Sequence, residues 1–343
     1  MAATVRPDAW QRLLEHAIRA PSPHNVQPWR VHILDALEAE LLIEKRRTLP
    51  KEDVTGSFII LTMGMFVEAL RLVAAHHGLA LDEEWVHEPA WYAAENLERV
   101  GQALIPFARL RLRGDVPPAA EIHDVTALLA ARRTSRLRYE PAPVGAEVEA
   151  QLAAVAQRWG HRYAQTSDPR RIERLLALNV EAVFEDLNHP PYRDELAGWL
   201  RYSERASRRH RDGLDARCMN VSPLELWTTF HLPWLLRFPP LRPWFRRRYR
   251  AQIGPVATLG FLCGPFWDPR DAAATGRLLL HFWLECTRLG LSIHPYGNLV
   301  TNRPTAARVR TETGLEDPWL VFKIGRSAPP PASRRRAVEE ILA

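Results

Sequence analysis

The segment RAPSPHNVQPWRVHIL, Arg19–Leu34, places a rigid polar loop between two different patterns. Before it, residues 8–20 carry apolar side chains at the spacing of one helix face, and after it WRVHIL alternates as a strand does. The loop holds Ser22, Asn25 and Gln27 between prolines, and side-chain amides both donate and accept hydrogen bonds. Two interpretations follow: an ordinary helix-to-strand connection whose amides cap the backbone, or half of a site that reads a planar heterocycle.

The composition is that of a folded globular protein without strong signs of another class. The 343 residues are 46% hydrophobic and 25% charged, which suits two domains or one large one. The net charge of +6 could favour nucleic acid or phosphorylated ligands, but it is small beside 46 basic and 40 acidic residues, so nucleic acid is disfavoured. Three sparse cysteines argue against a disulfide framework and favour a cytoplasmic location. A signal peptide or a membrane-spanning segment is not expected, because the longest apolar-rich run is broken by His231 and Pro233.

The spacing of four glycines indicates an internal duplication. Two long apolar helical patterns end at Gly78 and Gly290, 212 positions apart, and each leads into a strand. Two strand patterns end at Gly114 and Gly325, 211 positions apart, and prolines follow both. Coincidence is the alternative, because a helix followed by glycine and a strand is common. Repetition of both order and spacing favours duplication.

The second copy carries an additional aromatic, basic and proline-rich segment at about 183–250, which includes FHLPWLLRFPPLRPWFRRRYR. A long, loop-rich insertion of this kind is typical of a lid or a binding element. The alternative is a basic surface decoration. A nucleic-acid role for RRRYR lacks support from a groove-binding helix pattern or a series of stacking aromatics.

Three further motifs are candidates for binding. ARRTSRLRYEP surrounds Thr134 with arginines, a combination that suits phosphate, although a solvated basic loop has the same composition. SIHPYGNLVTN offers Gly297, which allows a close backbone approach to a ligand, or is simply a turn. The tail GRSAPPPASRRRAVEEIL is a second phosphate patch or a frayed basic terminus.

Several common chemistries are not indicated. The sequence lacks a P-loop, a GxGxxG after a strand and a GxSxG elbow. It also lacks HExxH and any CxxC spacing, so no metal site is expected.

Together these motifs resemble the nitroreductase family of FMN-dependent oxidoreductases. That family has, in order, a basic RRSxR loop, a helix, an APSxxNxQPW loop, a strand, a long core helix ending in GL, a Pro-Gly loop beside the flavin, and a final strand followed by basic residues. Its members are typically obligate dimers that bind the flavin at the interface. In this chain the first copy has APSPHNVQPW without RRSxR, and the second has RRTSR with GHRYAQTSD where the amide loop would follow. Each copy keeps the half that the other lacks.

The resemblance therefore implies a pseudo-dimer in one chain, similar to the tandem branch that includes the Acg-like proteins. The implied fold is α+β, with antiparallel or mixed central sheets flanked by helices. The first repeat would span residues 1–118 and be degenerate, and the second would span 122–343 with the lid insertion at about 183–250.

The resemblance also implies one composite FMN site. Tyr296, Gly297 and Asn298 would lie near the reactive flavin nitrogen, and no side-chain nucleophile is required. Departures from the family pattern are Thr134 in place of Ser, and Pro23 and His24 where small residues are common. The expected cofactor-binding residues are Ser22, His24, Asn25, Gln27, Arg132, Arg133, Thr134, Arg136, Gly297, Arg326, Arg334, Arg335 and Arg336.

The implied activity is an FMN-dependent oxidoreductase that takes hydride from NAD(P)H or an organic substrate and passes electrons to a nitroaromatic, a quinone or dioxygen. The alternatives are a protein that stores or sequesters FMN without turnover and a biosynthetic flavin-dependent dehydrogenase. The expected partner is a small-molecule substrate, with no nucleic acid and no membrane, and the chain would be a monomeric pseudo-dimer or a weak homodimer.

Overall fold

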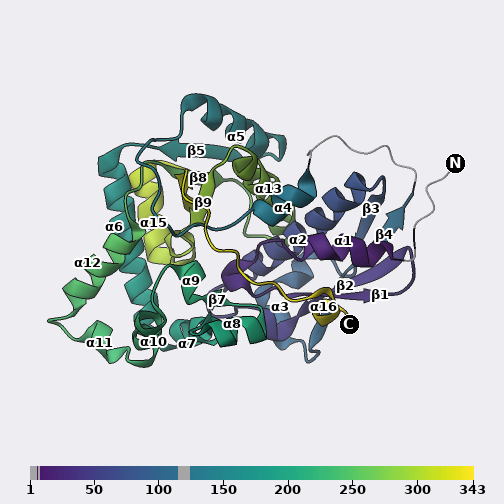
Figure 1. The fold of residues 1–343 in the computed structure, drawn as a ribbon, viewed down its shortest axis with the longest axis horizontal. Helices are drawn as coiled ribbons and strands as arrows, with labels where there is room; N and C mark the ends of the chain where they lie inside the picture. The colour runs from purple at the N-terminus through teal and green to yellow at the C-terminus, as the bar shows by residue number, and fades with distance from the viewer. Residues whose placement is uncertain (1–5, 7, 115–123) are drawn as a thin grey trace. The chain divides into compact units, whose positions relative to one another are not determined.

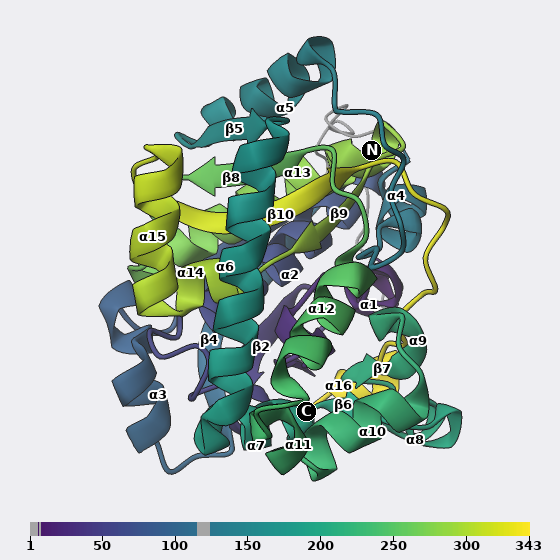
Figure 2. The same cartoon turned by 90° about the vertical axis from the view of Figure 1, so that its left-hand side faces the viewer.

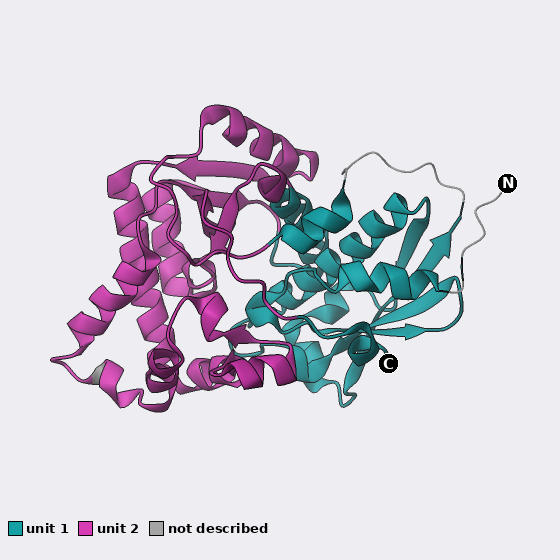
Figure 3. Cartoon of the chain, viewed as in Figure 1, with its two compact units in different colours: residues 1–132, 266–284, 335–343 teal, residues 133–265, 285–334 magenta. Residues whose placement is uncertain are grey.

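A computed structural model describes residue 6, residues 8–114 and residues 124–343. The chain forms two compact units (Figure 3). Unit 1 contains residues 1–132, 266–284 and 335–343, and unit 2 contains residues 133–265 and 285–334. Two stretches from the second half of the sequence therefore belong to unit 1. The repeat boundary expected between residues 118 and 122 lies outside the described residues.

Unit 1 is built on an antiparallel sheet in the order β1-β2-β4-β3 (Figure 1). Trp29 on the first strand is fully buried and stacks on Phe66 with ring centroids 4.6 Å apart. The elements of unit 1 are β1 (Trp29–Ile33), β2 (Glu38–Glu44), β3 (Ala80–Trp85), β4 (Leu104–Arg113), α1 (Ala9–Ala17), α2 (Ser57–His76), α3 (Ala94–Arg99), α4 (Val125–Ala131), α16 (Val338–Ile341) and most of α13 (Pro269–Arg288).

Unit 2 is built on a second antiparallel sheet in the order β5-β8-β10-β9 (Figure 2). The last of its strands in the sequence, β10, is buried along its whole length and pairs with β8 on one side and β9 on the other. Its main elements are β5 (Arg162–Thr166), β8 (Leu259–Cys263), β9 (Ser292–Pro295), β10 (Pro318–Gly325), α5 (Ala146–Arg158), α6 (Pro169–Asn188), α14 (Asn298–Thr301) and α15 (Arg303–Thr313).

The two sheets have the same topology. When the strands of each sheet are counted along the chain, both sheets run first, second, fourth, third, and every neighbouring pair is antiparallel. A 20-residue helix connects the second and third strands in both cases, α2 in the first sheet and α13 in the second. The fold is α+β and duplicated, with antiparallel sheets flanked by helices.

The two equivalent helices cross within unit 1 at a pair of glycines. A Cβ on Gly64 would lie 2.2 Å from the carbonyl oxygen of Ala273, and a Cβ on Gly276 would lie 2.1 Å from that of Leu61. Gly64 and Gly276 are 212 positions apart, and so are Leu61 and Ala273. The same contact is therefore made twice with the roles of the helices exchanged, as in a two-fold interface.

Helix α2 is apolar because it is a core helix. It is long and apolar enough to cross a membrane, but 83% of its most apolar window is buried inside the protein. Burial on nearly every side requires apolar residues all round the helix.

The insertion is helical rather than loop-rich. It connects β5 to β8 through α6, α7 (Pro190–Gly198), α8 (Glu204–His210), α9 (Ala216–Met219), α10 (Pro223–His231), α11 (Trp234–Arg237) and α12 (Arg242–Ile253), with a two-residue parallel pair, β6 (Leu200–Arg201) and β7 (Leu214–Asp215). The expected start at 183 falls inside α6. That helix begins at Pro169, where the Asp168 side chain accepts a hydrogen bond from the backbone N–H of Arg170.

Candidate functional site

The loop between α1 and β1 is held in a strained backbone conformation. His24, Asn25 and Gln27 have φ values of 46°, 57° and 51°, in the left-handed region that favours glycine. Each such residue costs about 1–2 kcal/mol, so three within four positions require compensating interactions. Backbone strain of this kind clusters at functional sites.

Hydrogen bonds fix this loop to the C-terminal segment. The Ser22 hydroxyl accepts from the backbone N–H of Gln27 at 3.1 Å. The Gln27 side chain is fully buried; its Nε2 donates to the Asn25 carbonyl at 3.3 Å, and its Oε1 accepts from the backbone N–H of Arg336 at 2.8 Å. The Asn25 Oδ1 accepts from the Arg335 guanidinium at 2.6 Å. Both amides therefore join the loop to residues 335–336.

Glu44 is a buried carboxylate that is surrounded by arginines. Burial opposes its ionisation, but the hydrogen bond from Arg46 and the charges of Arg336 and Arg47 outweigh it and lower the pKa of the Glu44 carboxyl. The guanidinium of Arg336 lies 3.1 Å from this carboxylate, and both side chains are buried. Arg336 is thus neutralised by a protein partner.

Arg132 is buried without such a partner. Its side chain is 6% exposed, donates to the Arg19 carbonyl at 3.2 Å and lies 4.6 Å from the centroid of the Trp283 ring. Within the described residues no carboxylate lies at ion-pair distance from it, and its Nε has no hydrogen-bond partner. Burial, and then the nearby charge of Arg335, lower the pKa of Arg132 to about 9. A buried cation that lacks a counterion favours binding of an anion.

Two acidic residues, Glu52 and Asp53, lie near the strained loop, and His24 contacts the first of them. The imidazole of His24 pairs with Glu52, and the neighbouring Asp53 accepts a hydrogen bond from the backbone N–H of Ile59 at 2.9 Å. Burial raises the pKa of Asp53 to about 7, against the effect of that hydrogen bond. His24 thus lies in the strained loop with its ring directed at a carboxylate.

In unit 2 the basic loop is ordered by backbone contacts. The Arg133 guanidinium donates to the Pro330 carbonyl at 2.8 Å, and Thr134 forms an isolated parallel β-bridge with Ile293 of β9. The Arg136 guanidinium donates to the Cys218 carbonyl at 3.1 Å, and burial lowers its pKa.

Lys323 is a buried cation that sequence reasoning missed. It is 1% exposed on β10, its Nζ donates to the carbonyls of Leu137 and Ile253, and it lies 4.3 Å from the centroid of the Tyr139 ring. Burial, and then Arg136, lower the pKa of Lys323 to about 8. Burial and these two cations also hold the pKa of His294 well below its usual value, so the imidazole is neutral. The sequence feature that could have indicated a buried cation is the single lysine within the otherwise apolar strand WLVFKIG.

The segment from Tyr296 to Asn298 follows β9. Tyr296 is buried, and its hydroxyl has no hydrogen-bond partner among the described residues. The Asn298 amide donates to Asp186 at 2.6 Å. Gly297 has a φ of −54° and no atom within 4 Å of an added Cβ, so space is open beside this backbone and glycine is not required by its conformation.

The remaining arginines of the tail are in different environments. Arg326 is exposed, whereas Arg334 pairs with Glu204 and donates to the Ser207 hydroxyl at 3.2 Å. Arg334 belongs to unit 2, while Arg335 and Arg336 belong to unit 1. The three consecutive arginines therefore do not share one set of contacts.

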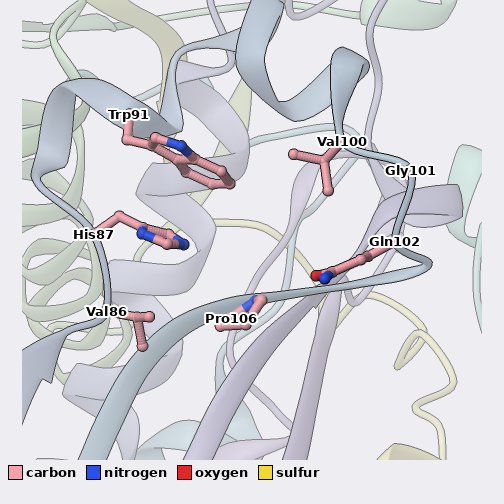
Figure 4. Close-up of a pocket in the computed structure, with 7 residues that line it drawn as sticks. All are labelled: Val86, His87, Trp91, Val100, Gly101, Gln102 and Pro106. Carbon is pink, nitrogen blue, oxygen red and sulfur yellow. The ribbon is translucent and has the colours of Figure 1, made fainter.

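A pocket of about 490 Å³ lies elsewhere in unit 1 (Figure 4). The rings of His87 and Trp91, 4.1 Å apart between centroids, form one side of it, and Gln102 lies opposite. None of its lining residues belongs to the motifs selected from the sequence. We place the candidate site at the strained loop and Arg132, because the buried charges and the backbone strain are found there.

Comparison with known proteins confirms the resemblance inferred from the sequence. No protein-family model matches the chain. The chain is 26% identical to the "Probable NAD(P)H nitroreductase PigM" of a Serratia species, over 96% of this chain and 92% of that protein. It is also 25% identical to the uncharacterized protein Rv3127 of Mycobacterium tuberculosis, over 95% of this chain and 90% of the relative. The chain thus resembles a nitroreductase over nearly its whole length.

Solved structures with some likeness include the FMN-dependent nitroreductase NfnB of Mycobacterium smegmatis in complex with NADPH, with 17% identity, a TM-score of 0.35 and coverage of 60% of this chain and 92% of that one. A nitroreductase with bound FMN from Desulfitobacterium hafniense has 14% identity, a TM-score of 0.36 and coverage of 62% and 94%. Because these TM-scores are low, the fold rests on the topology of this chain alone.

Proposed function

We propose that this chain is an FMN-dependent oxidoreductase that takes hydride from NAD(P)H and passes electrons to a small-molecule acceptor such as a nitroaromatic, a quinone or dioxygen. The observation that carries the proposal is the buried Arg132, which has no carboxylate partner in the described chain and lies beside a strained amide loop. The similarity to PigM over the whole chain supports it.

The residues of unit 1 offer groups that suit the phosphate of FMN. Arg132 and Arg335 supply the charge and forked donors that a phosphate requires. The Ser22 oxygen accepts from the Gln27 N–H, so its hydroxyl hydrogen can be donated to a ligand, while the Asn25 Oδ1 orients Arg335. Gln27 and Arg336 would act as positioning residues, because their polar atoms hold the loop and the C-terminal segment together.

The motifs of unit 2 are assigned by resemblance. Arg133, Thr134 and Arg136 are the residues that correspond to the RRSxR loop, and Tyr296 to Asn298 correspond to the loop beside the reactive nitrogen. When bound, FMN would supply the redox chemistry, and the protein would orient it and tune its charge. The cationic side chains would favour the forms of the cofactor that carry additional negative charge.

The first test is the visible absorption spectrum of the purified chain, repeated on the supernatant after heat denaturation. The proposal predicts flavin bands and release of FMN in a ratio close to one per chain. Steady-state oxidation of NADH and NADPH with added nitroaromatic or quinone then tests turnover. Bound FMN without turnover would instead support sequestration. A colourless protein that fails to bind added FMN would overturn the proposal.

A further inference from the structure

The part of the insertion formed by α10, α11 and α12 exposes large apolar side chains to solvent. We call residues 223–253 the aromatic tip. Five of the ten large hydrophobic residues that are exposed in the described chain lie in it: Leu224 (71% exposed), Trp234 (60%), Trp244 (53%), Phe238 (50%) and Trp227 (42%). The turn between α11 and α12 lies at the left-hand end of unit 2 (Figures 1 and 3). Such a concentration of exposed apolar surface marks an interaction site.

The aromatic tip is also strongly cationic. Its 31 residues include six arginines and one acidic residue, Glu225. Arg248 lies 3.2 Å from Glu225, and Arg250 lies 2.5 Å from Glu173 of α6, so two of the six arginines are paired. Arg242 and Arg247 are exposed and have no ion-pair partner among the described residues. Much of the net charge of the whole chain, +6, is therefore concentrated in the aromatic tip.

Surfaces that combine exposed tryptophans with unpaired arginines are typical of proteins that bind to a membrane surface. Indole rings prefer the headgroup region, where one end is apolar and the other is hydrated. Arginines are attracted to anionic headgroups, while their stems cover apolar surface. The helices of the aromatic tip have 9, 4 and 12 residues, so they can lie on a bilayer but are too short to span it.

We propose that the aromatic tip docks this protein onto the surface of an anionic phospholipid bilayer. The apolar side chains Leu224, Trp234 and Phe238 distinguish this partner from nucleic acid, because they offer aliphatic and aromatic area that a phosphate backbone does not cover. Docking would replace the sequence-based expectation that the chain has no membrane partner. It does not depend on the proposed function, because none of these residues belongs to the candidate cofactor site.

The test is cosedimentation of the full chain with two kinds of vesicle: equal parts of phosphatidylglycerol and phosphatidylcholine, and phosphatidylcholine alone. We expect binding to the anionic vesicles that weakens as salt rises. The double variants Trp234→Ser/Trp244→Ser and Arg242→Glu/Arg247→Glu should each lose affinity by about tenfold or more. Circular dichroism and thermal unfolding verify that both variants fold.

Matched controls separate docking from general stickiness. Trp267 in unit 1 is 41% exposed, and Arg303 at the start of α15 is exposed without an ion-pair partner in the described chain. Trp267→Ser and Arg303→Glu should leave vesicle binding unchanged. Failure to bind anionic vesicles, equal binding to both kinds of vesicle, or equal loss in the controls would overturn the proposal. Binding to a DNA duplex but not to vesicles would assign the aromatic tip to nucleic acid instead.

Discussion

At the scale of single residues, Arg132 is expected to lower the stability of the folded protein and to strengthen binding of an anion. One substitution tests both effects. Burial of an unpaired guanidinium destabilises the folded protein, whereas its charge favours a bound anion. Arg132→Met should therefore leave the melting temperature of the cofactor-free protein unchanged or higher. The same variant should weaken FMN binding by about 1.5–3 kcal/mol, or roughly 10- to 150-fold, because it removes charge-assisted hydrogen bonds.

The measurements are thermal unfolding and titration with FMN, each repeated on Arg19→Met. Arg19 is adjacent in space and exposed, so its variant should alter neither property. A lower melting temperature with unchanged FMN affinity would show that Arg132 has only a structural role.

Asp53 provides a pH dependence of stability with a defined sign. Its pKa is about 7 in the folded protein and 3.8 in the reference state, so the folded state binds the proton more tightly. The stabilisation from protonated Asp53 is present at low pH and is lost as pH rises through about 7. The slope is at most about 1.4 kcal/mol per pH unit.

Urea unfolding of the wild type and Asp53→Asn between pH 4 and 8 measures this effect. The variant keeps an acceptor for the Ile59 N–H but cannot ionise, so its free energy of unfolding should rise relative to that of the wild type as pH increases. Asp82→Asn, which removes an exposed ion pair with Arg113, is the control and should show a nearly constant difference. A constant difference for Asp53→Asn as well would place its pKa near the usual value.

At the scale of elements, the crossing of α2 and α13 depends on the absence of two side chains. A methyl group at Gly64 or Gly276 would overlap a backbone carbonyl, which cannot rotate away as a side chain can. Gly64→Ala and Gly276→Ala should each lower the free energy of unfolding by about 3 kcal/mol. The double variant should cost less than the sum, because one separation of the helices relieves both overlaps.

Chemical unfolding of the three variants tests this expectation, with Gly198→Ala as control. Gly198 ends α7 and has nothing within 4 Å of an added Cβ, so alanine there should be neutral or stabilising. Small and additive effects at Gly64 and Gly276 would mean that the helices do not approach this closely.

Sequence patterns predicted the elements whose apolar period is unmistakable. They identified α1, α2, β4, α13 and β10, and the 212-residue offset led to a duplication that both sheets display. They missed β2, in which EAELLIE mixes charged residues with a buried end. They also missed Lys323, because nothing in a strand sequence says that a buried amine will find two carbonyls.

For the candidate site, the sequence suggested residues but not the protein partners of their polar atoms. Gln27 was expected to contact a ligand, and in the structure its amide bonds to Asn25 and Arg336. Arg334 to Arg336 were expected to act together, yet Arg334 pairs with Glu204. Such partners come from segments up to 309 positions away, and local spacing carries no information about them.

At the scale of the whole molecule, unit 1 cannot be completed by the first repeat alone. Its sheet comes from residues 1–118, but α13 and the C-terminal segment come from the second repeat. That segment pairs with β1 through the N–H of Ala343 and the carbonyl of Val31, at 2.9 Å, and it holds the strained loop through Arg335 and Arg336. The core of unit 1 therefore depends on contacts between residues that are more than 200 positions apart.

We expect that residues 1–118 expressed alone do not fold, because the apolar face of α2 that meets α13 would be exposed and the strain at His24, Asn25 and Gln27 would lack its compensating bonds. Co-expression with residues 119–343 should restore a soluble complex, because the two fragments together contain every segment of unit 1. Circular dichroism and urea unfolding of the first fragment, alone and in the co-purified complex, make the comparison. Cooperative unfolding of the isolated fragment would show that the first repeat is an independent domain. Residues 266–284 and 335–343 would then contribute little to its core.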